Sequence, residues 1–362
     1  MQSLFEETKA YITARIASLL EAGDNRLPPD RELATEITAS YATLRLVMKE
    51  LEQQGLIRRI RGSGTYLTAK TQTLLQESQR RRLHIYAPFF PEAPEHDYGA
   101  LLLRTLYSKA ETHNWKSELT TVRNHREFIE QLEQEISHTD AVIYLPPTEP
   151  FPLEMIGRLA RFNSVPLVVL DCELSNLAID NITSDNRRGG MLAAAHLLAS
   201  GHRNIALLLC EPRLPQSLAR VQGFCDALEL AGLHAELIDC HVQAEDPRAL
   251  FARRALLDRL KRPHDFTAIF AISDAGAFGA LQAFEELNLV AGKDISLIGF
   301  GGVPAGENLS PRLTTIAQPI EEICRTAISW LDDPPNSHPQ HQLSPLLRPG
   351  ETVHTIPVAN SK

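Results

Sequence analysis

The stretch GLIRRIRGSGTYL, residues 55–67, contains three arginines and a Gly-Ser-Gly tip between short apolar runs. Arginine side chains neutralise phosphate groups, and glycine lets a backbone approach a ligand closely. These residue types in this order predict contact with a phosphate backbone rather than covalent catalysis. Taken alone, the stretch fits an ordinary hairpin turn better than a phosphate contact, so the elements around it have to decide between the two interpretations.

The charge of the chain is distributed unevenly along the sequence. The 362 residues have a net charge of -9 at pH 7, yet residues 41–70 contain six basic and only two acidic residues. Such a local basic patch on an acidic chain is typical of a nucleic-acid contact, and the overall charge conceals it.

Residue patterns for catalysis or metal binding are missing from the sequence. It has no G-x-S-x-G, H-E-x-x-H or P-loop motif, its 13 histidines are scattered, and none of its five cysteines forms a C-x-x-C pair. We therefore expect no catalytic residues, no metal site and no cofactor. There is also no signal-peptide pattern and no apolar run of membrane-spanning length, which predicts a soluble cytoplasmic protein with no membrane partner.

Residues 1–69 have the pattern of three helices followed by a hairpin. Apolar residues recur at helical spacing up to Gly23. Asp30 is then expected to cap a short helix, and Ser40 a longer one that ends at about Gln54. Two short β-type runs around the glycine tip predict the hairpin. Two helices joined by a tight turn indicate a helix-turn-helix, and the hairpin is then its wing.

The rest of the chain has the pattern of an α/β protein. Residues 70–82 are polar and read as a linker. From residue 83 to 362, apolar runs such as LHIYA, AVIYLP, VPLVVLD, NIALLLC, TAIFAIS and ISLIGF alternate with helical segments. Continuous apolar strands between helices indicate parallel sheets buried on both faces, and their number favours two doubly wound subdomains. The proline-rich residues 332–342 are expected to form a surface loop.

Residues 27–67, LPPDRELATEITASYATLRLVMKELEQQGLIRRIRGSGTYL, resemble the winged-helix domain of GntR-type transcription regulators. The matching family pattern is LPSERELA, SRxTVRxAL and LExxGLIxRxxGxGTFV. The resemblance implies DNA contacts at Arg31, Ser40, Tyr41, Thr43, Arg45, Arg61 and Gly62, and the charge of the wing adds Arg58 and Arg59. Tyr41 stands where the family usually has arginine, so the operator is expected to differ from the common ones.

Residues 83 to about 357 resemble the effector domain of the LacI/GalR family. The resemblance rests on DNRRGGMLAAAHLLASGHRNIA, ARVQGFCDALELAGL, AIFAISDAGAFGALQAFEELNL and PRLTTIAQPIEE. It implies a periplasmic-binding-protein-like fold of two α/β lobes joined by three crossovers, with a small ligand in the cleft. The implied effector contacts are Asp171, Arg220, Ser273 and Gln318, and Phe89, Phe90 or Tyr98 could form an aromatic wall. Asp274 follows Ser273 in the sequence. A role as the N-cap of the next helix fits it at least as well as an effector contact.

Two positions depart from the second family's pattern. The usual GFDD motif is GFGG here, so that Gly301 and Gly302 replace an acidic pair, and Ser273 stands in place of the usual asparagine. Both changes shorten the polar side chains available to a ligand. They predict either a different, bulkier effector or a site that no longer binds sugars.

Together these patterns predict a ligand-responsive DNA-binding transcription regulator, most simply a repressor. Its expected partners are double-stranded operator DNA, a carbohydrate-type effector and a second copy of the chain, since two-fold dimers match palindromic half-sites. The pairing of domains resembles that of arabinose-responsive repressors. One alternative is an enzyme that uses a sensor-like pair of lobes. Another is a sugar-binding transport component, which the missing signal peptide and the helix-turn-helix disfavour.

Overall fold

The fold is seen in a computed structural model that describes residues 4–37, 40–71, 73, 80–90, 92–93, 95–159, 162, 164–174, 179–335, 337 and 339–356. The chain divides into two compact units, Met1–Arg80 and Arg81–Lys362. The first strand of the larger unit begins at Arg81, so the last two residues of the expected linker 70–82 belong to a sheet. Residues 72 and 74–79 of that linker lie outside the described residues.

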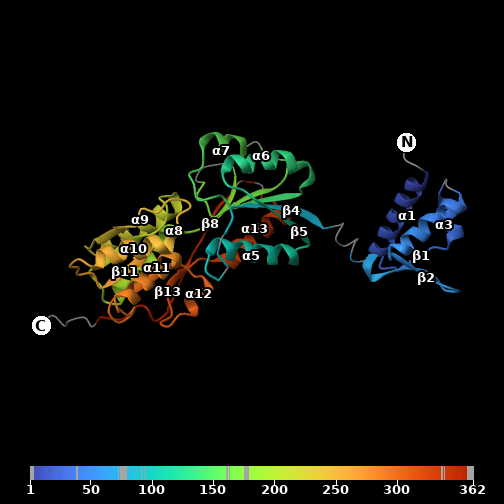
Figure 1. Cartoon of the computed structure of the whole chain (residues 1–362). Coiled ribbons are helices and arrows are strands. Elements are labelled where there is room, and N and C mark those ends of the chain that lie inside the picture. Colours follow the sequence, from blue (N-terminus) through green and yellow to red (C-terminus); the bar gives the residue numbers. More distant parts are fainter. Residues whose placement is uncertain are drawn as a thin grey trace. The chain divides into compact units, whose positions relative to one another are not determined.

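The smaller unit contains the predicted helices and hairpin and one further short strand (Figure 1). Its elements are α1 (Leu4–Glu21), β1 (Arg26–Leu27), α2 (Asp30–Glu36), α3 (Tyr41–Gln53), β2 (Ile57–Ile60) and β3 (Gly64–Leu67). The sheet order is β1-β3-β2, with antiparallel pairing throughout. The small core joins α1, α3 and the sheet through buried side chains such as Ile12, Val47 and Ile57.

One predicted helix cap in this unit was wrong. Pro29, and not Asp30, is the N-cap of α2, and no side chain caps that end. Asp30 is instead the first helical residue, where a carboxylate interacts favourably with the positive end of the helix. Ser40 does cap α3, because its hydroxyl accepts a hydrogen bond from the backbone N–H of Thr43.

The larger unit has two lobes, each built on a six-stranded sheet. In the first lobe the strand order is β14-β8-β7-β6-β4-β5, and every pair is parallel. Helices α5 and α13 cover one face of this sheet, and α6 and α7 cover the other (Figure 1). The elements of this lobe are β4 (Arg81–Ala87), α5 (Tyr98–Thr112), β5 (Trp115–Thr121), α6 (His125–Glu135), η1 (Ile136–His138), β6 (Ala141–Tyr144), α7 (Leu153–Leu159), β7 (Leu167–Leu170), β8 (Asp180–Ser184), α13 (Ile320–Asp332) and β14 (Gln340–Leu343).

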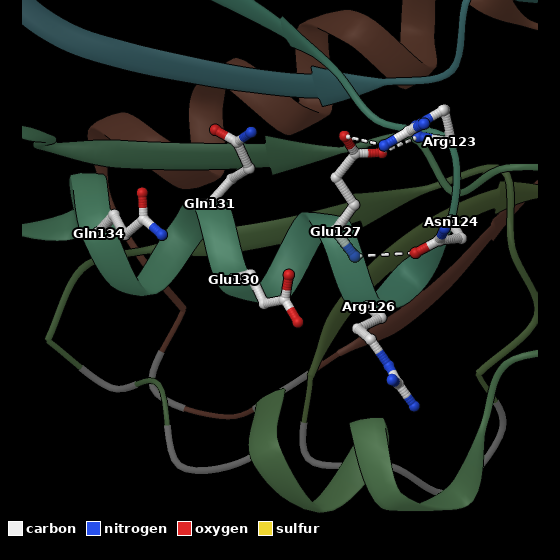
Figure 2. Close-up of a pocket in the computed structure, with 7 residues that line it drawn as sticks. All are labelled: Arg123, Asn124, Arg126, Glu127, Glu130, Gln131 and Gln134. Carbon is white, nitrogen blue, oxygen red and sulfur yellow. Dashed lines mark hydrogen bonds and ion pairs between the residues drawn. The ribbon is translucent and has the colours of Figure 1, made fainter.

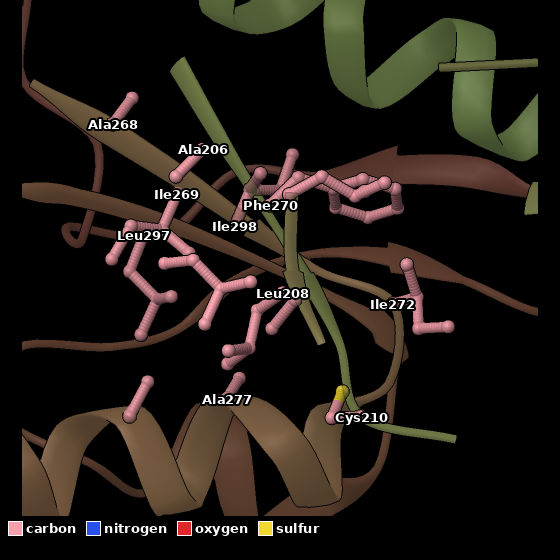
Figure 3. Packing of buried hydrophobic residues seen from close by; sticks show 14 of the residues in the cluster. Ala206, Leu208, Cys210, Ala268, Ile269, Phe270, Ile272, Ala277, Leu297 and Ile298 are labelled. Atoms are coloured by element: carbon pink, nitrogen blue, oxygen red, sulfur yellow. The ribbon is translucent and has the colours of Figure 1, made fainter. Parts of the chain in front are cut away.

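The second lobe has the order β10-β9-β11-β12-β13-β15, in which only the β13–β15 pair is antiparallel. Its core fills both faces of the continuous apolar strands, with Leu208 on the side of Ala277 and Phe270 on the opposite side (Figure 3). Its elements are α8 (Asn186–Ala199), β9 (Ile205–Leu209), α9 (Pro215–Leu230), β10 (Ala235–Asp239), α10 (Arg248–Leu260), β11 (Ala268–Ala271), α11 (Asp274–Glu286), β12 (Ser296–Gly301), α12 (Pro304–Glu307), β13 (Thr314–Ala317) and β15 (Leu346–Arg348).

The chain passes between the lobes three times, from β8 into α8, from β13 into α13 and from β14 into β15. This confirms the two-lobed fold with parallel sheets. The structure corrects one expectation near the last crossing. Residues 340–342, predicted as loop, belong to β14 at the edge of the first sheet. Their side chains are exposed, so the strand depends on backbone pairing with β8 and carries little apolar signal.

Close packing against α9 fixes the position of α8, the helix that follows the first crossing. A Cβ at Gly190 would lie 2.0 Å from the backbone oxygen of Arg220, and a Cβ at Gly223 would lie 1.9 Å from that of Arg187. Only glycine at both positions allows the two backbones to approach this closely. The contact places Arg220 directly beside the first crossing.

Candidate functional site

The first turn of α3 presents polar side chains to solvent. The Ser40 hydroxyl lies 3.2 Å from the backbone nitrogen of Thr43 and 3.0 Å from its hydroxyl. Leu44 and Val47 face the core, which turns the opposite side of the helix outward. Tyr41 is 48% exposed, and Arg45 is exposed as well. Both side chains therefore project from the N-terminal half of a firmly capped helix.

The hairpin of β2 and β3 carries a tight basic tip. Gly62 has a φ of 79°, in the left-handed region that favours glycine. Arg58 and Arg61 are exposed on the strand and the turn. Ser63 fastens the tip, because its hydroxyl lies 2.8 Å from that of Tyr66. The tip, like the first turn of α3, therefore combines positive charge with a backbone that a side-chain hydrogen bond holds in place.

Arg26 is a wing residue that the sequence analysis missed. Its guanidinium donates to the backbone oxygen of Ser63 at 2.7 Å and lies over the ring of Tyr66. The residue belongs to β1, a two-residue strand that is too short to give a periodic signal. It adds an exposed positive charge at the base of the glycine tip.

Arg59 differs from its two arginine neighbours. Its guanidinium is paired with the Asp30 carboxylate at 3.0 Å, and its backbone N–H donates to Glu52. The expected contribution of Arg59 to the basic wing is therefore cancelled locally, since this charge holds the hairpin against α2. Arg31, one position after Asp30 on α2, remains exposed.

In the larger unit, Tyr98 and Asp171 meet in the first lobe. Tyr98 opens α5 and Asp171 follows β7, and the phenol hydroxyl lies 3.4 Å from the carboxylate. Asp171 has a φ of 54°, an uncommon conformation for a residue with a side chain. Burial raises the pKa of this carboxyl to about 6, against the opposing effect of the nearby Arg220.

Arg220 belongs to the second lobe and is 7% exposed. Its Nε donates to Asn186 at 2.8 Å, and its Nη1 donates to the backbone oxygen of Ile272 at 3.0 Å. The guanidinium carbon lies 4.0 Å from the centre of the Phe300 ring. Three neighbours thus hold the cation of the second lobe within electrostatic reach of Asp171 in the first.

Gln318 and Ser184 join two of the three crossings. The Ser184 hydroxyl donates to the Gln318 side chain at 2.8 Å, and both residues are buried. The backbone oxygen of Ser184 also accepts a hydrogen bond from Asn186 at 3.0 Å. A continuous series of contacts therefore runs from the α13 crossing through the α8 crossing to Arg220.

Ser273 is the N-cap of α11 and accepts a hydrogen bond from the backbone of Gly276 at 3.2 Å. The alternative reading of Asp274 as that cap was wrong. The Asp274 carboxylate, only 3% exposed, accepts hydrogen bonds from the backbone of Gly302 and Val303 and from the hydroxyl of Thr315. It therefore secures the glycine turn that replaces the family's acidic pair.

Several charged residues in this region were not predicted. Glu173 interacts with Asn186 and Arg220, and burial raises the pKa of its carboxyl. Arg248 donates to Glu211 at 2.9 Å, and it also reaches the Thr148 hydroxyl of the other lobe at 3.5 Å. The negative charge of Glu211 in turn helps to raise the pKa of the Asp171 carboxyl. We refer to this set as the interlobe cluster, and it comprises Tyr98, Asp171, Glu173, Asn186, Glu211, Arg220 and Arg248.

The remaining predicted residue, Phe89, is 76% exposed, whereas its neighbour Phe90 packs against the core of the first lobe. A separate surface hollow follows α6 from Arg123 to Gln134 (Figure 2). Figure 2 shows its polar side chains projecting along one side of the helix, with Asn124 capping the helix and Arg123 paired with Glu127. These contacts are those of a solvated helix face.

Two negative findings apply to the described part of the chain. None of its helices is long and apolar enough to cross a membrane. Among the same residues, no group of three or more histidine, cysteine or acidic side chains is placed to hold a metal ion.

Two family models match separate parts of the chain, one within each of the two units. Residues 4–67 match the family described as bacterial regulatory proteins, gntR family, and residues 194–353 match a periplasmic binding protein-like domain. A transcriptional repressor named PurR from Yersinia enterocolitica is 34% identical over 184 residues, which is 51% of this chain and 53% of that protein. The chain thus spans about half the length of the curated relatives it matches. The gntR family model and the PurR relative are both regulatory proteins.

Solved structures agree with this fold. A LacI family regulator from Enterococcus faecium with bound ribose has a TM-score of 0.63 and 24% identity, over 76% of this chain and 100% of that one. A lac repressor dimer bound to operator has a TM-score of 0.65 and 19% identity, over 80% of this chain and 99% of that one. Residues 4–67 thus match the gntR family of bacterial regulatory proteins, and the larger unit has the periplasmic-binding-protein-like fold that is also seen in solved LacI family regulators.

Proposed function

We propose that this chain is a transcription regulator that binds operator DNA through its N-terminal unit and a small effector at the interlobe cluster. The observation that carries the DNA-binding part is the pairing of a capped helix with a basic, glycine-tipped wing in one small unit. A recognition helix places the side chains of its first turns in the major groove. Arg45 and Tyr41 are exposed at those positions, with Ser40 and Thr43 beside them.

The wing supplies the contacts that do not depend on base sequence. Arg58 and Arg61 would neutralise phosphates, and Gly62 lets the turn approach the DNA backbone. Arg31 at the start of α2 adds a further phosphate contact. Because Tyr41 cannot form the paired hydrogen bonds by which arginine recognises guanine, base selection falls mainly on Arg45.

The regulator is proposed to act as a homodimer and a repressor in the cytoplasm, where operator DNA is found. Two-fold symmetric dimers bind palindromic half-sites, and each half-site would take one winged helix. The repressor assignment is supported by the PurR relative, which is named a transcriptional repressor.

DNA binding is tested by selecting duplexes from a randomised pool with the full chain and measuring affinity for the selected sequence. Arg45→Ala is expected to lower this affinity about 5- to 150-fold, because a lost base contact costs roughly 1–3 kcal/mol. Arg126→Ala is the matched control, since it removes the same charge from an exposed helix of the other unit. Failure to select any duplex, or unchanged binding by Arg45→Ala, would contradict the proposal.

The effector is proposed to be a carbohydrate or a similar polyhydroxyl compound. Asp171, Glu173 and Asn186 offer acceptors, and the guanidinium of Arg220 offers donors, which suits neighbouring hydroxyl groups. The ring of Phe300 lies beneath Arg220, and Tyr98 is the aromatic residue on the opposite lobe. The ribose bound by the Enterococcus faecium regulator supports this class of ligand.

Effector binding is tested by thermal stabilisation of the full chain across pentoses, hexoses, nucleosides and purine bases. A compound that binds the folded state raises the Tm by mass action. Arg220→Ala should abolish that rise while leaving operator binding intact. Arg187→Ala is the control, because it removes an arginine of the same lobe that is exposed and paired with Asp226. A rise that survives Arg220→Ala would place the ligand elsewhere.

A further inference from the structure

One carboxylate, that of Asp332, binds side chains from three other elements of the first lobe. It accepts hydrogen bonds from the indole N–H of Trp115 at 3.1 Å and interacts with the Nδ1 of His113 at 2.7 Å. It also forms an ion pair with Arg81. The guanidinium carbon of Arg81 lies over the ring of Trp115, 3.9 Å from its centre. We call these four residues the Asp332 anchor.

Arg81 connects the anchor to the part of the chain that leads to the smaller unit. It is the first residue of β4, and the larger unit begins there. Arg81 is therefore the residue at which the chain coming from the smaller unit enters the larger one. The anchor joins it to the C-cap of α5, the start of β5 and the last residue of α13.

The other end of α13 begins at the interlobe contacts. Gln318 lies two residues before the helix and is bonded to Ser184 at the neighbouring crossing. The 13 helical residues correspond to about 20 Å at 1.5 Å per residue. Their buried face, including Ile323, Ala327 and Leu331, belongs to the core shared with α5. A helix packed in this way moves as a unit.

We propose that α13 and the Asp332 anchor transmit rearrangement of the interlobe crossings to Arg81, and through it to the linker of the DNA-binding unit. This inference rests on the function proposed above and specifies how that function is regulated. Movement of Gln318 shifts α13, and the shift carries Asp332 with it. Asp332 holds Arg81 through an ion pair, and both residues contact Trp115. A shift of Asp332 therefore moves Arg81 and with it the end of the linker.

A purely structural role predicts a different outcome. The side chains of Arg81 and Asp332 are 45% and 29% exposed, and ion pairs of such exposure contribute little to stability. Breaking the anchor should therefore change the coupling between the two ends of α13 more than it changes the Tm. Asp332→Asn is a suitable variant, since the amide oxygen can still accept the Trp115 hydrogen bond while the charge is lost.

The experiment is a double-mutant cycle on affinity for the selected duplex, using the full chain. Gln318→Ala perturbs the end of α13 that lies at the interlobe crossings, and Asp332→Asn perturbs the anchor at the other end. In the wild-type background Gln318→Ala is expected to change DNA affinity about fivefold or more, the lower end of typical allosteric coupling. In the Asp332→Asn background the same substitution should change it less than twofold, and Arg81→Gln should reproduce that result.

Glu133→Gln is the matched control. It breaks the Glu133–Arg158 ion pair, which joins α6 and α7 on the opposite face of the same sheet and is similarly exposed. In that background Gln318→Ala should keep its full effect. Equal effects of Gln318→Ala in all backgrounds, or no effect in the wild type, would overturn the inference while leaving DNA binding established. If the wild type selects no duplex, the proposed function itself fails, and this inference fails with it.

Discussion

The Asp274 carboxylate and the backbone N–H of Gly302 form a buried hydrogen bond of 2.6 Å. Its neighbour Gly301 has a φ of 145°, and a Cβ there would lie 3.0 Å from the same carboxylate. Replacement of the family's acidic pair by glycines therefore does more than shorten the polar side chains that are available to a ligand. It leaves room for Asp274 to hold the turn at the end of β12.

This contact predicts that the family residue cannot simply be restored. Gly301→Asp would place a second carboxylate against Asp274, whose pKa is already raised by burial. We expect the Tm to fall by several degrees, with no gain in sugar binding. Gly301→Ala adds the Cβ without the charge and should cost less. A stable Gly301→Asp variant that binds a sugar more tightly would contradict this account of the turn.

Arg58 and Arg59 should respond oppositely to alanine substitution. Arg58 is exposed on the wing, so Arg58→Ala should weaken DNA binding and reduce the salt dependence of affinity by about one unit of slope, with little change in Tm. Arg59→Ala loses the pairing with Asp30 and should lower the Tm of the small unit instead. Salt titrations and melting curves of both variants separate the two roles, and identical behaviour would disprove the distinction.

Asp171 should make stability depend on pH. Its pKa is raised by burial from 3.8 to about 6, so between these values the folded state holds a proton that the unfolded state has released. The contribution of this group to the free energy of unfolding is present below pH 3.8 and falls as pH rises through about 6, by roughly 3 kcal/mol in total.

Asp171→Asn tests this dependence because it stays neutral at every pH. The variant should melt several degrees higher than the wild type at pH 7.5 and close to it at pH 4. Its amide oxygen can still accept the Tyr98 hydrogen bond, so the packing is retained. A difference in Tm that stays constant across the pH range would show that ionisation of Asp171 is not responsible.

Ser40→Ala should destabilise α3 locally. Loss of an N-cap hydroxyl costs roughly 0.5–2 kcal/mol, and here the hydroxyl accepts from the backbone of Thr43. Faster amide exchange in the first turn of α3 is the expected signature, and Ser40→Asp should restore slow exchange because aspartate also caps helices. Unchanged exchange in the alanine variant would argue against the cap.

Local sequence signals were sufficient for several features that short-range chemistry decides, although they failed for the expected Asp30 cap. The Ser40 cap, the Gly62 turn and the apolar strands of both sheets follow from side-chain types and spacing within a few residues. The two-lobed architecture also followed, because buried parallel strands have continuous apolar sequences. The edge strand β14 was missed because three of its four side chains are exposed and give little apolar signal.

Contacts between distant residues were decided only by the tertiary structure. Tyr98 and Asp171, or Arg81 and Asp332, have no local pattern that pairs them, since the partners lie 73 and 251 residues apart. Likewise, the sequence counts Arg59 as a free charge and Asp274 as a possible cap, until folding brings Asp30 and Gly302 against them. Residue type determined which chemistry was available, and the tertiary fold determined which of those groups meet, because it brings elements together that are distant in the sequence.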